Sequence, residues 1–202
     1  PGVAKLIGAA VFPVGLMLVV ICGAELFTGN NLMTLALMNN KITGGQMVKN
    51  WCVVWVGNLV GSIALALIVF YGDVLTGDAA TKAIAIAEGK AGLDIMTMIL
   101  RGILCNILVV LAVWMATSAQ DIISKIFACW FPIMLFVLCG FEHSVANMSL
   151  MMIGLLNPAQ YDISIGGYAY NLAVVTIGNM VGGILFLAVP YFLIGKEKVA
   201  KN

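Results

Sequence analysis

The residues best suited to chemistry lie together inside a long apolar stretch. Glu142, His143, Ser144 and Asn147 fall within six residues, and His143 is the only histidine of the chain. They interrupt an otherwise apolar run over residues 126–156. Ionisable groups in a lipid-spanning segment are costly unless they face protein or a water-filled cavity. The cluster therefore predicts a break in a spanning helix, where the chain lines a pathway.

The same pattern occurs a second time. Segment 22–25 (Cys-Gly-Ala-Glu) is followed by Asn30, as segment 139–142 (Cys-Gly-Phe-Glu) is followed by Asn147. Phe-Pro precedes the two copies at 12–13 and 131–132, and Gly-Asn-x-Val-Gly follows them at 57–61 and 178–182. Gly and Pro interruptions at corresponding places in two halves of a membrane protein point to a transporter's binding site. We therefore expect the two breaks to form one paired site.

Composition indicates an all-α membrane protein. Hydrophobic residues make up 62% of the 202 residues and charged ones 9%, with a mean hydropathy of +1.09. Apolar stretches near twenty residues are typical of spanning helices. A net charge of +1 without a basic stripe argues against nucleic acid as a partner. The five cysteines lack metal-ligand spacing, so we expect no metal and no cofactor.

We expect a single transmembrane domain, 1–202, made of a first repeat at 1–72 and a second at 94–195. The expected spanning segments are 6–27 (resuming weakly to 38), 51–71, 95–115, the broken 126–156 and 168–194, joined by a turn at 39–45, a loop at 72–94, a short connection at 117–125 and a loop at 157–167. The first repeat has one segment fewer than the second. We therefore expect a further helix before Pro1 in the intact protein, giving an inverted repeat of three plus three helices.

Loop charges predict the orientation. The region 39–50 has two lysines and no acid, and the tail after residue 194 has three lysines against one glutamate. The loops 72–94 and 157–167 are acidic on balance. Since lysine and arginine are enriched in cytoplasmic loops, we expect a multi-pass protein of the inner (plasma) membrane with a cytoplasmic C-terminus.

The polar residues of the breaks allow more than one role. His143 is either a structural histidine bonded to a neighbouring helix or a functional group of the pathway. Glu25 and Glu142 either pin the broken backbone or bind a cation. Two helix N-termini meeting at the breaks would attract a small anion, to which hydroxyl and amide groups could donate hydrogen bonds; the donors are Thr28, Ser144, Asn30 and Asn147.

Apolar residues near the breaks are open to two interpretations as well. Phe12, Leu16, Leu26 and Phe136 are either core residues or hydrophobic constrictions that strip water from a solute. The two Gly-Asn-x-Val-Gly segments serve either close helix packing or a polar pore lining.

Six strings resemble the formate–nitrite transporter family, and the resemblance covers essentially the whole chain. The most specific are Cys-Gly-Ala-Glu-Leu-Phe-Thr at 22–28 and Gly-Phe-Glu-His-Ser-Val-Ala-Asn-Met at 140–148, and the others lie at 49–51, 57–61, 111–115 and 175–179. The resemblance implies an aquaporin-like protomer with six helices, two of them broken, in a homopentamer. The family's first spanning helix has no counterpart in this chain.

The resemblance also implies roles for individual residues. His143 and Thr28 would face each other at the pore centre with Asn171 nearby, and Lys90 would draw anions into a vestibule. The four apolar residues named above would form narrow rings. The implied solutes are formate, nitrite and hydrosulfide.

We therefore expect a channel or proton-coupled transporter for small monovalent anions. Formate is the first candidate solute, and hydrosulfide and nitrite are alternatives. A neutral-solute pore of aquaporin type is a more distant alternative. An intramembrane enzyme using Glu142 and His143 lacks a nucleophile or metal cluster, so we expect no enzymatic activity. The expected partners are the anion, membrane lipid and further copies of the chain.

Overall fold

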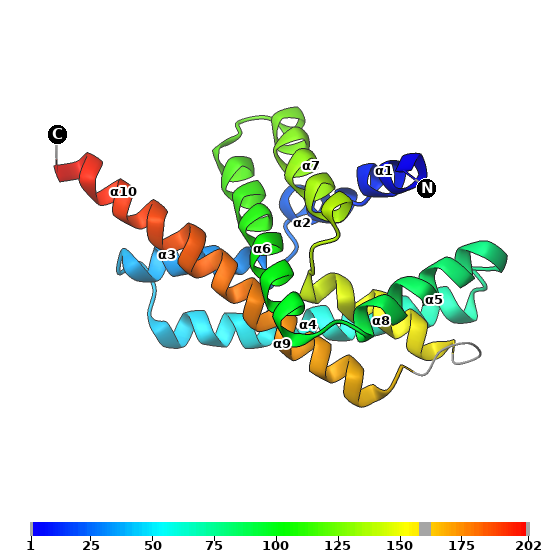
Figure 1. Cartoon of the computed structure of the whole chain (residues 1–202). Helices are drawn as coiled ribbons and strands as arrows, with labels where there is room; N and C mark the ends of the chain where they lie inside the picture. The colour runs from blue at the N-terminus through cyan, green and yellow to red at the C-terminus, as the bar shows by residue number, and fades with distance from the viewer. Residues whose placement is uncertain (1, 158–162, 201–202) are drawn as a thin grey trace.

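The computed structural model describes the backbone of residues 2–157 and 163–200 and the side chains up to residue 196. The described elements are helical throughout (Figure 1). They are α1 (Gly2–Val11), α2 (Val14–Cys22), η1 (Gly29–Leu32), α3 (Met33–Met38), α4 (Gly44–Tyr71), α5 (Gly77–Ala91), α6 (Ile95–Ser118), α7 (Ile122–Cys139), α8 (Ser144–Leu156), α9 (Ile165–Gly183), the π-helix η2 (Ile184–Ala188) and α10 (Val189–Ala200).

Five stretches of the described chain are long and apolar enough to cross a membrane. They are Gly2–Cys22, Gly44–Tyr71, Ile95–Ser118, Ile122–Cys139 and Ile165–Lys196, and the apolar helix α8 is shorter. The all-helical membrane architecture is therefore confirmed. α4 begins earlier than residue 51, because Thr43 and Gln46 form a capping box at its N-terminus.

The prediction of a loop at 72–94 is wrong, because most of this segment forms helix α5. This segment is too short and too charged to span a membrane, but it is rich in alanine, the best helix former. Its buried residues Ile84 and Ala87 lie on one face, and Ala87 packs directly on Gly154 of α8. α5 and α8 lie side by side in Figure 1. The predicted loop 157–167 lies partly outside the described residues, and α9 begins at its end.

Both predicted breaks are present, and the helices that precede them end in the same way. α2 stops at Gly23 with φ of 76°, and α7 stops at Gly140 with φ of 72°. These left-handed conformations suit glycine, which has no Cβ to clash with the backbone. The chain then runs without regular structure to η1 after the first break and to α8 after the second.

The two repeats meet at equivalent positions. The Trp55 indole N–H donates to the Thr176 hydroxyl at 3.2 Å, across 121 residues. Asn58 and Asn179 are separated by the same offset. Trp55 and Thr176 are therefore repeat equivalents in contact, as residues on a pseudo-two-fold axis must be.

Glycines allow α6 and α9 to pack closely. A Cβ on Gly178 would lie 3.2 Å from the Ile99 Cα and 3.3 Å from the Gly102 Cα. The equivalent glycines of α4, Gly57 and Gly61, have no atom within 4 Å of such a Cβ in the described part of the chain. Small-residue helix packing is therefore seen in the second repeat.

Candidate functional site

His143 lies between two cavities, and it lines both. The central cavity, of about 220 Å³, is lined mainly by apolar side chains including Leu16 and Leu26. The outer cavity, of about 580 Å³, opens between α1, α5 and the second break. The residues shared by both linings are Phe12, Phe136, His143 and Ala146. A solute moving between the cavities would therefore pass the imidazole ring.

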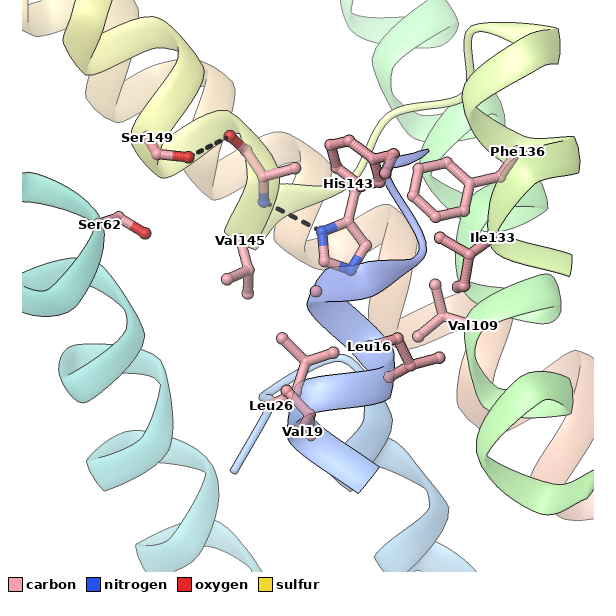
Figure 2. Close-up of a pocket in the computed structure, with 13 residues that line it drawn as sticks. Leu16, Val19, Leu26, Ser62, Val109, Ile133, Phe136, His143, Val145 and Ser149 are labelled. Atoms are coloured by element: carbon pink, nitrogen blue, oxygen red, sulfur yellow. Dashed lines mark hydrogen bonds between the residues drawn. The ribbon is translucent and has the colours of Figure 1, made fainter. Parts of the chain in front are cut away.

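Aromatic rings flank this passage. Phe12 and Phe136 meet edge to face with centroids 5.8 Å apart, and Phe136 stacks on the His143 ring at 5.6 Å. Leu16 and Leu26 lie below the His143 ring in the view of Figure 2 and line the central cavity. The four apolar residues predicted as core or as constrictions all line the central cavity together with His143, at positions where they can narrow the route.

The local sequence fixes how His143 is held. The residue is the N-cap of α8, where its Nδ1 accepts a hydrogen bond from the Ala146 N–H at 3.0 Å (Figure 2). A neutral ring that accepts at Nδ1 carries its hydrogen on Nε2. That nitrogen lies 2.8 Å from the Thr28 hydroxyl oxygen, so it donates to Thr28. Thr28 immediately precedes η1, as His143 precedes α8, so the N-terminal ends of the two helices after the breaks meet at this bond.

Asn179 holds the backbone on both sides of His143. Its Oδ1 accepts from the Ser144 N–H at 2.9 Å, and its Nδ2 donates to the Glu142 carbonyl at 2.9 Å and to the Gly102 carbonyl at 2.8 Å. The unwound segment has lost its helical hydrogen bonds, and its buried backbone groups need other partners. One asparagine supplies them and so fixes the position of the histidine.

Asn58 does the same in the first break. Its Oδ1 accepts from the Phe27 N–H at 3.0 Å, and its Nδ2 donates to the Glu25 carbonyl at 3.0 Å. The residue enclosed by these two bonds is Leu26. Leu26 is therefore the repeat equivalent of His143, and the pseudo-symmetric pair presents one apolar and one polar side chain to the pathway.

Each glutamate of the breaks accepts a hydrogen bond from the asparagine five residues later. Asn30 donates to Glu25 and also to Asn50 at 2.8 Å. In the second repeat, Asn147 donates to Glu142 at 2.7 Å and to Asn171 at 2.9 Å. This geometry fits a role in pinning the backbone.

Glu142 has a further partner that its position in the sequence did not suggest. Both of its carboxylate oxygens accept from the Lys90 Nζ at 2.9 Å, and the exposed side-chain fractions are 14% for Lys90 and 4% for Glu142. Two further lysines, Lys5 and Lys82, line the same outer cavity. The lysines of the cavity thus outnumber its glutamate three to one, giving it a net positive lining.

Three of the four residues predicted to bind the anion line neither cavity. Asn171 is fully buried, where it accepts from Asn147 and donates to the Lys90 carbonyl at 3.0 Å. Ser144 is also fully buried; its N–H donates to Asn179, and its hydroxyl has no hydrogen-bond partner among the described residues. Thr28 is fully buried as well, and its hydroxyl contacts the His143 Nε2.

Several residues of the site escaped prediction. Ser62 of α4 and Ser149 of α8 are the hydroxyl groups of the central cavity (Figure 2). Asn106 of α6 donates to the Asn31 side chain at 2.8 Å and to the Asn179 carbonyl at 2.7 Å, joining the two breaks. An asparagine in the middle of an apolar span was the available signal for Asn106, because such a group needs a buried partner.

Comparison with known proteins agrees with this architecture. A family model described as formate/nitrite transporter matches residues 1–193. The chain is 43% identical over 214 residues to a probable formate transporter of Methanothermobacter thermautotrophicus, covering 95% of this chain and 75% of that protein. It is 35% identical over 197 residues to the nitrite transporter NirC of Salmonella typhimurium, covering 95% and 72%.

A solved structure gives the same result. A pentameric formate channel with formate bound matches with a TM-score of 0.83 at 36% identity, over 96% of this chain and 84% of that one. The matches extend over nearly the whole chain, including both broken segments. The chain therefore belongs to the formate/nitrite transporter family.

Proposed function

We propose that the chain forms a channel or proton-coupled transporter for small monovalent anions, with formate as the first candidate and nitrite or hydrosulfide as alternatives. The observation that carries the proposal is the position of His143, a buried polar ring that lines two cavities next to the apolar side chains of Phe12 and Phe136. A formate-bound channel and a nitrite transporter among the similar proteins support the solute class.

The proposed passage begins in the outer cavity. Its excess of lysines attracts an anion, although the Lys90 charge is already paired with Glu142. Lys5 and Lys82 therefore share the vestibule role proposed for Lys90. The anion then loses water at the ring of Phe12 and Phe136. A bare charge crossing against 100 mV costs about 2.3 kcal/mol besides its desolvation, and proton uptake near His143 removes both costs.

The hydrogen bonds of His143 constrain how a proton can be exchanged. A doubly protonated ring would have to release the Ala146 N–H, because a protonated Nδ1 cannot accept. Proton exchange at Nδ1 is thus coupled to loss of the helix cap. Exchange at Nε2 would instead involve the Thr28 hydroxyl.

The decisive experiment measures formate flux into proteoliposomes across pH for wild type, His143→Ala and His143→Asn. Asparagine is a strong N-cap, so His143→Asn keeps α8 capped while removing the titratable group. We expect both variants to lose the pH dependence of flux and the Asn variant to stay folded. An unchanged pH dependence in a folded His143→Asn protein would contradict the mechanism. Swelling with glycerol but no formate flux in wild type would favour the neutral-solute pore.

The Lys90–Glu142 pair allows an independent test of the outer cavity. Glu142→Gln leaves the largely buried ammonium of Lys90 without its carboxylate, and breaking a buried pair costs about 3–5 kcal/mol. We expect lower thermal stability for this variant and partial recovery in Lys90→Met/Glu142→Gln, where no charge remains. Equal stability of the single and double variants would contradict a pinning role for the pair.

We propose that the protein assembles as a homopentamer in the inner (plasma) membrane, with its C-terminus in the cytoplasm. The pentameric relative supports the assembly, and the lysines of 39–50 and of the tail support the orientation. Large apolar residues are exposed on the spanning helices, among them Val53, Val60 and Ile68 of α4 and Phe131 of α7. Such surfaces suit contact with lipid or with another protomer. Cross-linking in membranes and proteolysis of a C-terminal tag from each side would test both statements.

A further inference from the structure

A third cavity lies away from His143, and the proposed solute pathway does not include it. This lysine cavity has a volume of about 790 Å³ and lies between α3, α6 and α10. Its walls include Leu35 and Ala36 of α3, Trp114 near the end of α6, and Tyr191 and Phe192 of α10. α3 and α10 lie together in Figure 1, at the side of the molecule opposite α1.

The charged residues of the lysine cavity are both cations. Lys41 and Lys196 belong to its lining, which contains no aspartate or glutamate among the described side chains. The Lys196 Nζ lies 4.6 Å from the centroid of the Phe192 ring, so a cation–π contact holds its ammonium at the cavity. A cavity whose described side chains include two ammonium groups and no carboxylate favours an anionic group.

The aromatic residues indicate the depth of the lysine cavity in the membrane. The rings of Trp114 and Tyr191 are in contact, with centroids 5.1 Å apart. Trp114 lies four residues before the end of α6, where this spanning helix leaves the apolar layer. Tryptophan and tyrosine are enriched at the boundary between hydrocarbon and water. The apolar walls therefore face the layer of acyl chains, and the lysines lie at its edge.

We propose that the lysine cavity binds an anionic phospholipid, with the head-group phosphate between Lys41 and Lys196 and an acyl chain along the apolar walls. Basic pockets between spanning helices recognise such head groups through lysine, and each cation near the surface strengthens the attraction about five-fold. The turn at 39–45 and the end of α10 are also the two regions that the loop charges assign to one face of the membrane. This inference does not depend on which solute the pore carries.

Quenching of Trp114 fluorescence by brominated lipid provides the test. The protein is reconstituted into phosphatidylcholine vesicles that contain either brominated phosphatidylglycerol or brominated phosphatidylcholine, and the signal lost in Trp114→Phe defines the contribution of Trp114. We expect brominated phosphatidylglycerol to quench it at a several-fold lower mole fraction. Lys41→Gln and Lys196→Gln should each weaken this preference about five-fold, and Lys41→Arg should keep it.

The matched control is Lys49→Gln, which removes an exposed lysine of the same region that does not line the cavity. It should leave the preference unchanged. Equal quenching by the two lipids in wild type, or an equal loss in Lys49→Gln, would overturn the proposal. Abolition of the preference by excess inorganic phosphate would overturn it as well, because the site would then recognise a free anion and not a lipid.

Discussion

Removing Asn179 is the sharpest test of how the second break is built. Its side chain makes three hydrogen bonds to the backbone, to Ser144, Glu142 and Gly102, at 2.8–2.9 Å, and it is fully buried. In Asn179→Ala, an N–H group and two carbonyl groups lose this partner.

The size of the effect follows from these contacts. A neutral hydrogen bond contributes about 1 kcal/mol net, and a buried group left without a partner costs about 1–3 kcal/mol, so we expect Asn179→Ala to lower the free energy of unfolding by about 3–5 kcal/mol. Asn58 is the internal control. It makes two such bonds in a partly exposed site, where water can replace the side chain. We expect Asn58→Ala to cost about 1–2 kcal/mol.

Thermal unfolding of both variants in one detergent measures the difference, and formate flux reports on the site. Without Asn179 the backbone on either side of His143 is released, which disturbs the 2.8 Å contact with Thr28. We expect flux to fall at least ten-fold at temperatures where Asn179→Ala is still folded. Equal destabilisation by the two substitutions, or full flux in Asn179→Ala, would refute this account of the break.

Two further predictions concern packing and pH. In Gly182→Ala the new Cβ would lie 3.0 Å from the Ile103 Cα, so we expect the free energy of unfolding to fall by about 1–3 kcal/mol, measured by thermal unfolding. The control Gly89→Ala, at an open helical position, should not destabilise the protein. Hydrogen bonds from the Thr97 hydroxyl and then its N–H lower the pKa of Asp94, the N-cap of α6. The stability from this cap is therefore present above the unfolded pKa and is lost as pH falls through the lower folded pKa. Asp94→Asn, which still caps, should show a smaller loss of thermal stability below about pH 4.

Much of the site could be predicted from residue type and spacing. Two repeated glutamates, each five residues before an asparagine, marked both breaks, and each asparagine does bind its glutamate. Such contacts within one segment depend on local geometry, which the spacing specifies. The charges of the segment 72–94 favour a loop, whereas its alanines favour the helix that the structure contains.

Contacts between distant segments could not be predicted in the same way. Lys90 is separated from Glu142 by 52 residues, and Asn106 from Thr28 by 78, where its Nδ2 donates to the Thr28 carbonyl. Neither spacing carries a periodic signal. Each contact depends on how α5 and α6 pack against the breaks, which is set by side-chain volume and by glycines that admit a neighbouring backbone.

That this chain crosses a lipid layer several times and unwinds twice at equivalent places follows from the amino-acid sequence, because apolar length and the positions of glycine, proline and polar residues are local properties. The packing of separate helices, which the sequence does not show, brings Leu26 and His143 to the same cavity and Lys90 to Glu142. These are spatial relations between residues of different segments. They arise when buried polar groups of separate helices must satisfy one another in the absence of water.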